Sequence, residues 1–210
     1  MPGSGKMKQA VILPLIFFLN GCTLGLAETA ASRTYFLNPE ISWKKPPAFS
    51  QRLADSVLLI TQPKTQPGFD TPRMAYLPRP HEVAYFAFNQ WADTPARMLQ
   101  RVLVKNLDKT DLWSAVLQTP GAAPAQYRLD SDNLVLEQQF FSRPSLVRLA
   151  LRAQLIDVRK QTVLGTRNFE AIEIAPSDDP YGGVVAANLA TAKLITELGQ
   201  WLSMVMKHPG

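Results

Sequence analysis

Cysteine and histidine are scarce in this 210-residue sequence. Its single cysteine is Cys22, and its two histidines are His81 and His208. A lone thiol cannot form an intramolecular disulfide, and two histidines so far apart lack the usual spacing of metal ligands. We therefore expect no disulfide and no metal site, and we expect both histidines on the solvated surface.

Catalytic and nucleotide-binding motifs are also missing. Gly182-Gly183 lacks the Lys-Ser/Thr pair of a phosphate-binding loop, which favours a turn at the start of a helix. No Gly-x-Ser-x-Gly elbow is present, so a Ser-His-Asp triad would have to be assembled by the fold alone. Asp178-Asp179 lies just before the same helix, where capping and the helix dipole favour carboxylates without any acid–base role. The sequence therefore predicts a non-enzymatic protein.

Long runs of basic residues are absent as well. The chain has 22 Lys and Arg residues against 17 Asp and Glu residues, and its net charge is +5. Because the basic residues are scattered, nucleic-acid binding has little support. Contact with anionic lipid headgroups or with an acidic partner is compatible with this charge.

An apolar segment near the N-terminus is too short to span a membrane. Lys6 and Lys8 precede an apolar run of ten residues, 10–19, whereas a transmembrane helix needs about 20. A basic start followed by a short apolar run is typical of a secretory leader. We therefore expect an exported protein, and the lack of further cysteines suits the oxidising periplasm.

The leader-like run ends in Leu19-Asn20-Gly21-Cys22. This tetrapeptide resembles the bacterial lipobox, where the leader is cut before a cysteine that carries lipid; Leu19 and Gly21 match the pattern, and Asn20 departs from it. We predict cleavage between Gly21 and Cys22, with a diacylglycerol and an N-acyl lipid on Cys22 and no cofactor. The alternatives are a Cys22 buried as a small apolar residue, a soluble exported protein, and an uncleaved anchor.

The predicted cleavage site and the composition of the chain divide it into four segments. Residues 1–21 are predicted to be a lipoprotein signal peptide, and residues 22–32 a lipidated tether of small and polar residues. Residues 33–206 are predicted to form a single domain, and residues 207–210 a frayed tail. The predicted domain is long enough to bury one substantial core.

Within the domain, several short strands precede a helix, and further strands precede a second helix. Thr94-Pro95 favours a helix start, and the helix is expected to end at Leu107. Apolar and polar residues alternate over 147–155, and residues 162–174 are expected to pair with that strand as a hairpin. The order predicts an α+β fold, with a mostly antiparallel sheet and two amphipathic helices packed on one face.

Three further expectations concern local structure. The second helix is expected over 183–206, with Val185, Leu189 and Ala192 facing inward along with larger apolar residues further on. The prolines of residues 63–80 exclude a helix and are expected to confine any strand there to a sheet edge. A phase change of the apolar positions near Asp130 predicts a bulge or a turn.

Tryptophan supplies the candidate contact residues. Trp43 lies in a proline-rich segment, and Trp91 directly precedes the first predicted helix. Because tryptophan is enriched at interfaces, both are candidates for contact with a partner or a lipid. Core packing is the competing interpretation; it is favoured for Trp91 and evenly balanced for Trp43.

Several passages in a fixed order carry a family resemblance. Residues 83–95 form a strand followed by a Trp and a capped helix; residues 127–129, the alternating strand through 157, and the last helix through Trp201 follow. This order resembles the ABC-type transport auxiliary lipoprotein family, the PqiC-like lipoproteins of Mce-domain lipid transport systems. The chain departs from the family in length and content over residues 63–80.

The resemblance implies a lipoprotein on the periplasmic face of the outer membrane. Its implied partners are an Mce-domain protein that bridges the periplasm, an ABC permease and an ATPase; a homo-oligomer stays open. Thr23, where lipoproteins of enterobacterial type carry Asp for inner-membrane retention, favours the outer membrane by the same resemblance.

The function predicted in this way is to dock or complete the outer-membrane end of the periplasmic bridge. Two alternatives remain. A periplasmic lipid carrier or chaperone would hold an acyl chain in a hollow between sheet and helices. A scaffold for assembly of envelope complexes would need neither lipid nor an Mce partner.

Overall fold

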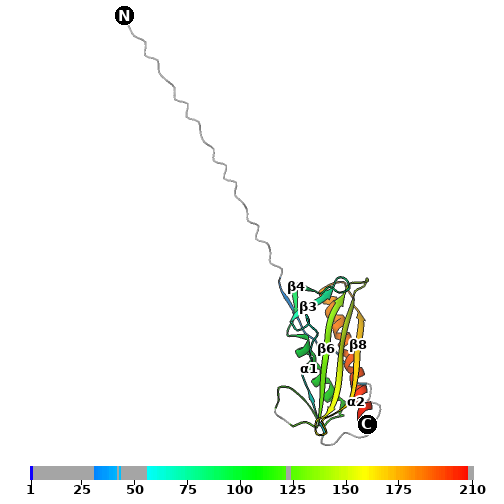
Figure 1. Ribbon diagram of the computed structural model, residues 1–210. Coiled ribbons are helices and arrows are strands. Elements are labelled where there is room, and N and C mark those ends of the chain that lie inside the picture. The colour runs from blue at the N-terminus through cyan, green and yellow to red at the C-terminus, as the bar shows by residue number, and fades with distance from the viewer. Residues whose placement is uncertain (2–30, 42, 44–55, 122–123, 208–210) are drawn as a thin grey trace. The chain divides into compact units, whose positions relative to one another are not determined.

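The computed structural model describes Met1 and residues 31–41, 43, 56–121 and 124–207. Cys22, Gly21 and the predicted signal peptide lie outside the described residues, so the structure does not test them. The described residues from Ala31 onward belong to one compact unit, shown in Figure 1.

The described part of this unit contains eight strands, two α-helices and a short 3-10 helix. In chain order they are β1 (Arg33–Tyr35), β2 (Val57–Ile60), β3 (Arg73–Leu77), β4 (Ala84–Trp91), α1 (Pro95–Leu107), the 3-10 helix (Asp108–Thr110), β5 (Ala115–Gln118), β6 (Tyr127–Gln139), β7 (Leu146–Asp157), β8 (Thr162–Ile174) and α2 (Pro180–Lys207).

β6 is the central strand of the sheet. One of its edges pairs with β7 over nearly its whole length, and β7 in turn pairs with β8, both antiparallel. The other edge is shared: β2 pairs in parallel with the start of β6, and β3 pairs in parallel with its end. β5 extends the sheet beyond β2, and β4 and β1 extend it beyond β3. Figure 1 shows the helices together behind this sheet.

The predicted α+β class is confirmed, with two helices against one sheet. Alternate residues of β7, such as Leu149, Leu151 and Leu155, are buried in the core beneath the helices. The predicted hairpin of β7 and β8 is also confirmed. The parallel pairing of the short strands was not predicted, because a short apolar run does not specify its partner.

The first helix has the predicted bounds. The Thr94 hydroxyl accepts a hydrogen bond from the Arg97 backbone N–H at 3.4 Å, and Pro95 is the first helical residue. The predicted apolar stripe of α1 is buried: Met98, Leu99, Val102, Leu103 and Leu107. The phase change in β6 is a bulge, where the register with β7 shifts between Asp132 and Val135 and Asn133 adopts a φ of 55°.

Two local predictions are wrong. β3 lies between β4 and β6 and not at an edge, because Pro72 and Pro78 flank the strand without interrupting it. Leu189 of α2 is 53% exposed, and Val185 and Ala192 are only half-buried. The inward face of this part of α2 consists of small residues, Gly183, Ala186, Ala187 and Ala190, which bring the helix close to the sheet.

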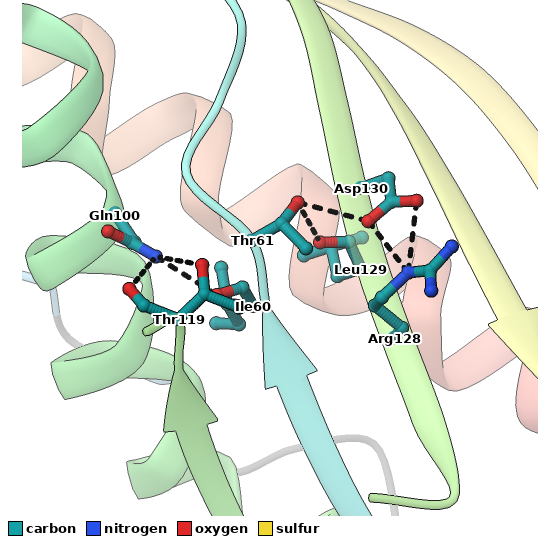
Figure 2. Close-up of polar contacts among 7 residues, drawn as sticks. All are labelled: Ile60, Thr61, Gln100, Thr119, Arg128, Leu129 and Asp130. Atoms are coloured by element: carbon teal, nitrogen blue, oxygen red, sulfur yellow. Dashed lines mark hydrogen bonds and ion pairs between the residues drawn. The ribbon is translucent and has the colours of Figure 1, made fainter. Parts of the chain in front are cut away.

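Hydrogen bonds from side chains join the short strands to their neighbours (Figure 2). The buried Gln100 side chain on α1 donates to the Ile60 carbonyl at 3.0 Å and the Thr119 carbonyl at 3.1 Å, at the ends of β2 and β5. The Thr61 hydroxyl lies 3.2 Å from the Leu129 carbonyl oxygen and 3.0 Å from Asp130 Oδ1 on β6. They add to the backbone hydrogen bonds at the same place, in which the N–H groups of Thr119 and Thr61 donate to the Ile60 and Leu129 carbonyls, each at 3.1 Å.

Candidate functional site: tryptophans, helix α2 and the sheet faces

The two candidate tryptophans both pack against the core. Trp91 is buried at the end of β4, and Trp43 is half-buried with its ring on Gly199 of α2. A Cβ atom on Gly199 would lie 2.7 Å from the Trp43 ring, so the glycine allows this contact. The indole N–H of Trp43 has no hydrogen-bond partner among the described residues. Their role as partner or lipid contacts stays a prediction.

The start of α2 is built from the residues that sequence analysis assigned to capping. Asp179 Oδ1 accepts a hydrogen bond from the Gly182 N–H at 2.7 Å, and Asp178 Oδ1 accepts one from the Ser145 N–H at 2.6 Å. These backbone hydrogen bonds hold the pKa of both carboxyl groups below the ordinary value. The pair therefore fixes α2 to the start of β7, as expected for cap residues.

A buried glutamine lies beneath this helix start. Gln138 Nε2 donates to Ser145 Oγ at 2.9 Å and to the Asp179 carbonyl at 3.2 Å, while its Oε1 has no partner among the described residues. A Cβ atom on Gly183 would lie 2.3 Å from that oxygen, so only glycine fits there without a shift. The adjoining cavity has a volume of about 10 Å³, which is about the space for one water molecule.

A shallow groove runs along the outer side of α2. Its volume is about 310 Å³, and Tyr181, Val185 and Leu189 give it apolar walls. The Asn38 backbone N–H donates to Asn188 Oδ1 at 2.7 Å and so fixes the segment after β1 along one side of the groove. Sequence analysis missed this surface because Val185 and Leu189 were assigned to the core.

The sheet face opposite α2 carries ion pairs that run across its long strands. Arg152 on β7 makes a bidentate ion pair with Asp132 on β6, at 2.9 and 2.5 Å. Arg148 lies between Glu137 on β6 and Glu170 on β8. Charged groups that satisfy one another across strands need no ligand. Glu137 is buried, whereas the more exposed pair of Arg152 and Asp132 contributes little stability.

Some site types are not found in the described part of the chain. Among residues 31–41, 43, 56–121 and 124–207, no cluster of three or more His, Cys, Asp or Glu side chains could hold a metal ion. No helix among them is both long and apolar enough to cross a membrane. His81 is exposed in the turn between β3 and β4, as predicted.

The fold and these surfaces define an α+β domain of packed interior, with ion pairs across one sheet face and an apolar groove on its last helix. The family model for the ABC-type transport auxiliary lipoprotein component matches residues 35–199, and the chain belongs to this family. The predicted resemblance is therefore confirmed, and the family's description connects the chain with ABC-type transport.

Solved structures share the fold. The crystal structure of protein XCC0632 from Xanthomonas campestris, of the family DUF330, is 20% identical, covers 83% of this chain and 97% of its own, and superposes with a TM-score of 0.70. The crystal structure of an uncharacterized protein is 12% identical and covers 82% of this chain and 99% of its own, with a TM-score of 0.63. Comparison with curated proteins gives no match.

Proposed function

We propose that this chain is a non-enzymatic lipoprotein, anchored through Cys22 to the periplasmic face of the outer membrane. Its folded domain docks or completes the outer-membrane end of an Mce-type lipid transport bridge. ATP hydrolysis and permeation belong to other chains of that system. The observation that carries the proposal is the family match over residues 35–199, directly downstream of a lipobox-like Cys22.

The packed interior favours docking over lipid carriage. A carrier would hold an acyl chain between the sheet and the helices, yet the cavity beside Gln138 and Gly183 has only about 10 Å³. Such a space accommodates about one water molecule and not a chain of methylene groups. Two larger hollows lie instead on the surface of the described domain: one of about 310 Å³ along α2, and one of about 410 Å³ beside Tyr127, Asp157 and Lys160.

Substitution of the anchor residue tests the first half of the proposal. Cys22→Ser removes the thiol that carries the lipid, so the protein should move from the membrane fraction to the soluble periplasmic fraction and lose metabolic labelling by palmitate. Thr23→Ser, which keeps Cys22, is the matched control and should stay in the membrane. A Cys22→Ser protein that stays membrane-bound would contradict the anchor.

Membrane sorting and partners are tested separately. Thr23→Asp should redirect the lipidated protein to the inner-membrane fraction, because Asp at this position favours retention there in lipoproteins of enterobacterial type. The unsubstituted protein, purified in mild detergent after crosslinking in cells, should bring down an Mce-domain protein with its permease and ATPase. Recovery of the lipoprotein without an Mce-domain protein would contradict the docking role but leave the anchor intact.

A further inference from the structure

Several large apolar side chains are exposed at one end of the described domain. We call this the tether end; it comprises the β3–β4 turn (residues 78–83), the β6–β7 loop (residues 140–145), the end of β8 and the first turn of α2. Four such side chains lie there, with exposed fractions of 42% for Val83, 48% for Phe141, 62% for Ile174 and 60% for Tyr181. Solvated apolar groups at one end of a domain are candidates for contact with a partner or a membrane.

The chain enters the domain beside this end. β1 pairs in parallel with the last part of β4, from Asn89 to Trp91, so residue 31 lies further back along β4, towards its start at Ala84. Figure 1 shows the start of the described domain next to the labels of β3 and β4. Eight residues lie between Cys22 and Ala31, and the nine residue-to-residue steps span at most about 30 Å when fully extended.

The tether length therefore limits which end can approach the bilayer closely. The opposite end carries the β7–β8 turn and also exposes apolar side chains, Val158, Val163 and Met204, so exposure alone does not select an end. The 12 residues of β7 place this opposite end about 40 Å from the β6–β7 loop. If Cys22 carries the anchor, a tether of this length lets the tether end approach the leaflet readily, whereas the opposite end would reach it only with the tether stretched almost completely.

We propose that the tether end rests on the leaflet that carries the lipid anchor, with Phe141, Val83, Ile174 and Tyr181 in the headgroup region. This inference rests on the anchor proposed above. The apolar side chains come from a turn, a loop, the end of β8 and the first turn of α2, and such a discontinuous set suits a fluid lipid surface. Tyr181 also borders the groove on α2, so the groove opens beside the tether end.

Charges at the tether end are nearly balanced. Arg79 pairs with Glu82 in the β3–β4 turn, Arg143 lies near Asp178, and Arg33 lies near Asp179. Contact with lipid is therefore driven by the apolar side chains and is independent of anionic lipid. Raising the salt to about 1 M, where the Debye length is about 3 Å, leaves such contact unchanged.

The only cysteine of the chain makes a direct test available. Lipidation converts the Cys22 thiol to a thioether, so Phe141→Cys gives the lipidated protein a single free thiol at the tether end. Val158→Cys is the matched control, because Val158 is also an exposed apolar residue but lies in the β7–β8 turn. Ile174→Cys is a second tether-end position, so the result does not depend on one variant folding.

Each lipidated variant is labelled with an environment-sensitive fluorophore and reconstituted in phosphatidylcholine vesicles that contain a headgroup-region quencher lipid. We expect quenching at positions 141 and 174 to exceed quenching at position 158 by at least about threefold. Equal quenching at all three positions would overturn the proposal. Slow thiol labelling at position 141 without quenching would overturn it too, because it would mean that another copy of the protein covers this surface.

The unsubstituted protein separates this inference from the anchor. If Cys22 itself reacts with a maleimide, the thiol is free, and both the anchor and the membrane-facing end fail. If Cys22 is unreactive and the three positions are equally quenched, the anchor stands and only the orientation of the domain is wrong.

Discussion

The two parts of the sheet are held together in different ways. β6, β7 and β8 are 12 or 13 residues long and pair antiparallel over nearly their full length, with α2 packed on them. β1 to β5 are three to eight residues long and are mainly joined by short parallel pairings. We call these the long-strand part and the short-strand part.

The difference lies in which groups satisfy the backbone. In the long-strand part, continuous ladders pair successive N–H and C=O groups whatever the side chains are. In the short-strand part, ladders end after two to four residue pairs, and side chains complete them: Gln100 binds the ends of β2 and β5, and the Gln126 side chain accepts from the Val57 N–H at 2.7 Å. The structure of the short-strand part therefore depends on individual polar residues.

The largest expected effect tests whether the two parts unfold together. Leu155→Ala in β7 and Leu58→Ala in β2 remove the same atoms from fully buried positions. Each should lower the free energy of unfolding by about 2–5 kcal/mol, because both leave a cavity in one shared core. Urea unfolding followed by circular dichroism measures the change. A Leu58→Ala protein with an unshifted main transition would show instead that the short-strand part unfolds independently.

A buried glutamine tests the dependence on polar side chains. Gln100→Leu keeps most of the volume but removes the side-chain donor to the Thr119 carbonyl and one of the two donors to the Ile60 carbonyl, which keeps the Thr119 N–H. The substitution should cost about 1–3 kcal/mol of stability, because the partly buried Thr119 carbonyl loses its donor. Hydrogen exchange should become faster in β2 and β5 before it changes in β7. The control is Gln200→Leu on the exposed side of α2, expected to stay within about 0.5 kcal/mol. Equal losses in the two variants would contradict this role.

The difference between the long-strand part and the short-strand part also explains which elements could be predicted from the sequence. β7 and β8 were found because alternation of apolar residues defines a half-buried strand, and α1 because Thr94-Pro95 marks its start. The parallel partners of β2 were not found, since a short apolar run is compatible with many pairings. Leu189 was wrongly predicted to be buried. The buried face of α2 near Gly183 consists of small residues, and the prediction took the larger apolar residues to mark that face.

The candidate sites show the same difference between local sequence patterns and contacts made by the fold. Cys22 was predicted from adjacent residues, since a leader and its cleavage motif are local patterns. The tether end could not be predicted, because Val83, Phe141, Ile174 and Tyr181 are far apart in the sequence and the sheet topology brings them to one end. The groove on α2 likewise depends on the contact of Asn38 with Asn188.

A smaller effect is expected where α1 begins. Thr94→Ala removes the hydroxyl that caps the helix, and the loss should be about 0.5–1 kcal/mol, since the cap hydrogen bond is long at 3.4 Å. Thr94→Ser keeps the hydroxyl and should retain most of the stability. Thermal unfolding of the two variants checks this, and an equal loss in both would mean that the methyl group matters more than the cap.

The smallest expected effect is on the pH dependence of stability. It arises at the start of α2, where side chains hold the long-strand part together. Hydrogen bonds from Ser145 and Gly182 hold the pKa of Asp178 and Asp179 below the ordinary value. The unfolded chain then binds protons more readily than the folded one, so this contribution is present above about pH 4 and is lost as the pH falls through the lowered pKa. Asp178→Asn and Asp179→Asn should each flatten the loss of stability between about pH 5 and pH 2, as measured by urea unfolding at each pH. Asp70→Asn, an exposed residue of the segment before β3, is the control. If all three variants follow the parent protein over this range, the carboxylates at the start of α2 do not couple folding to pH.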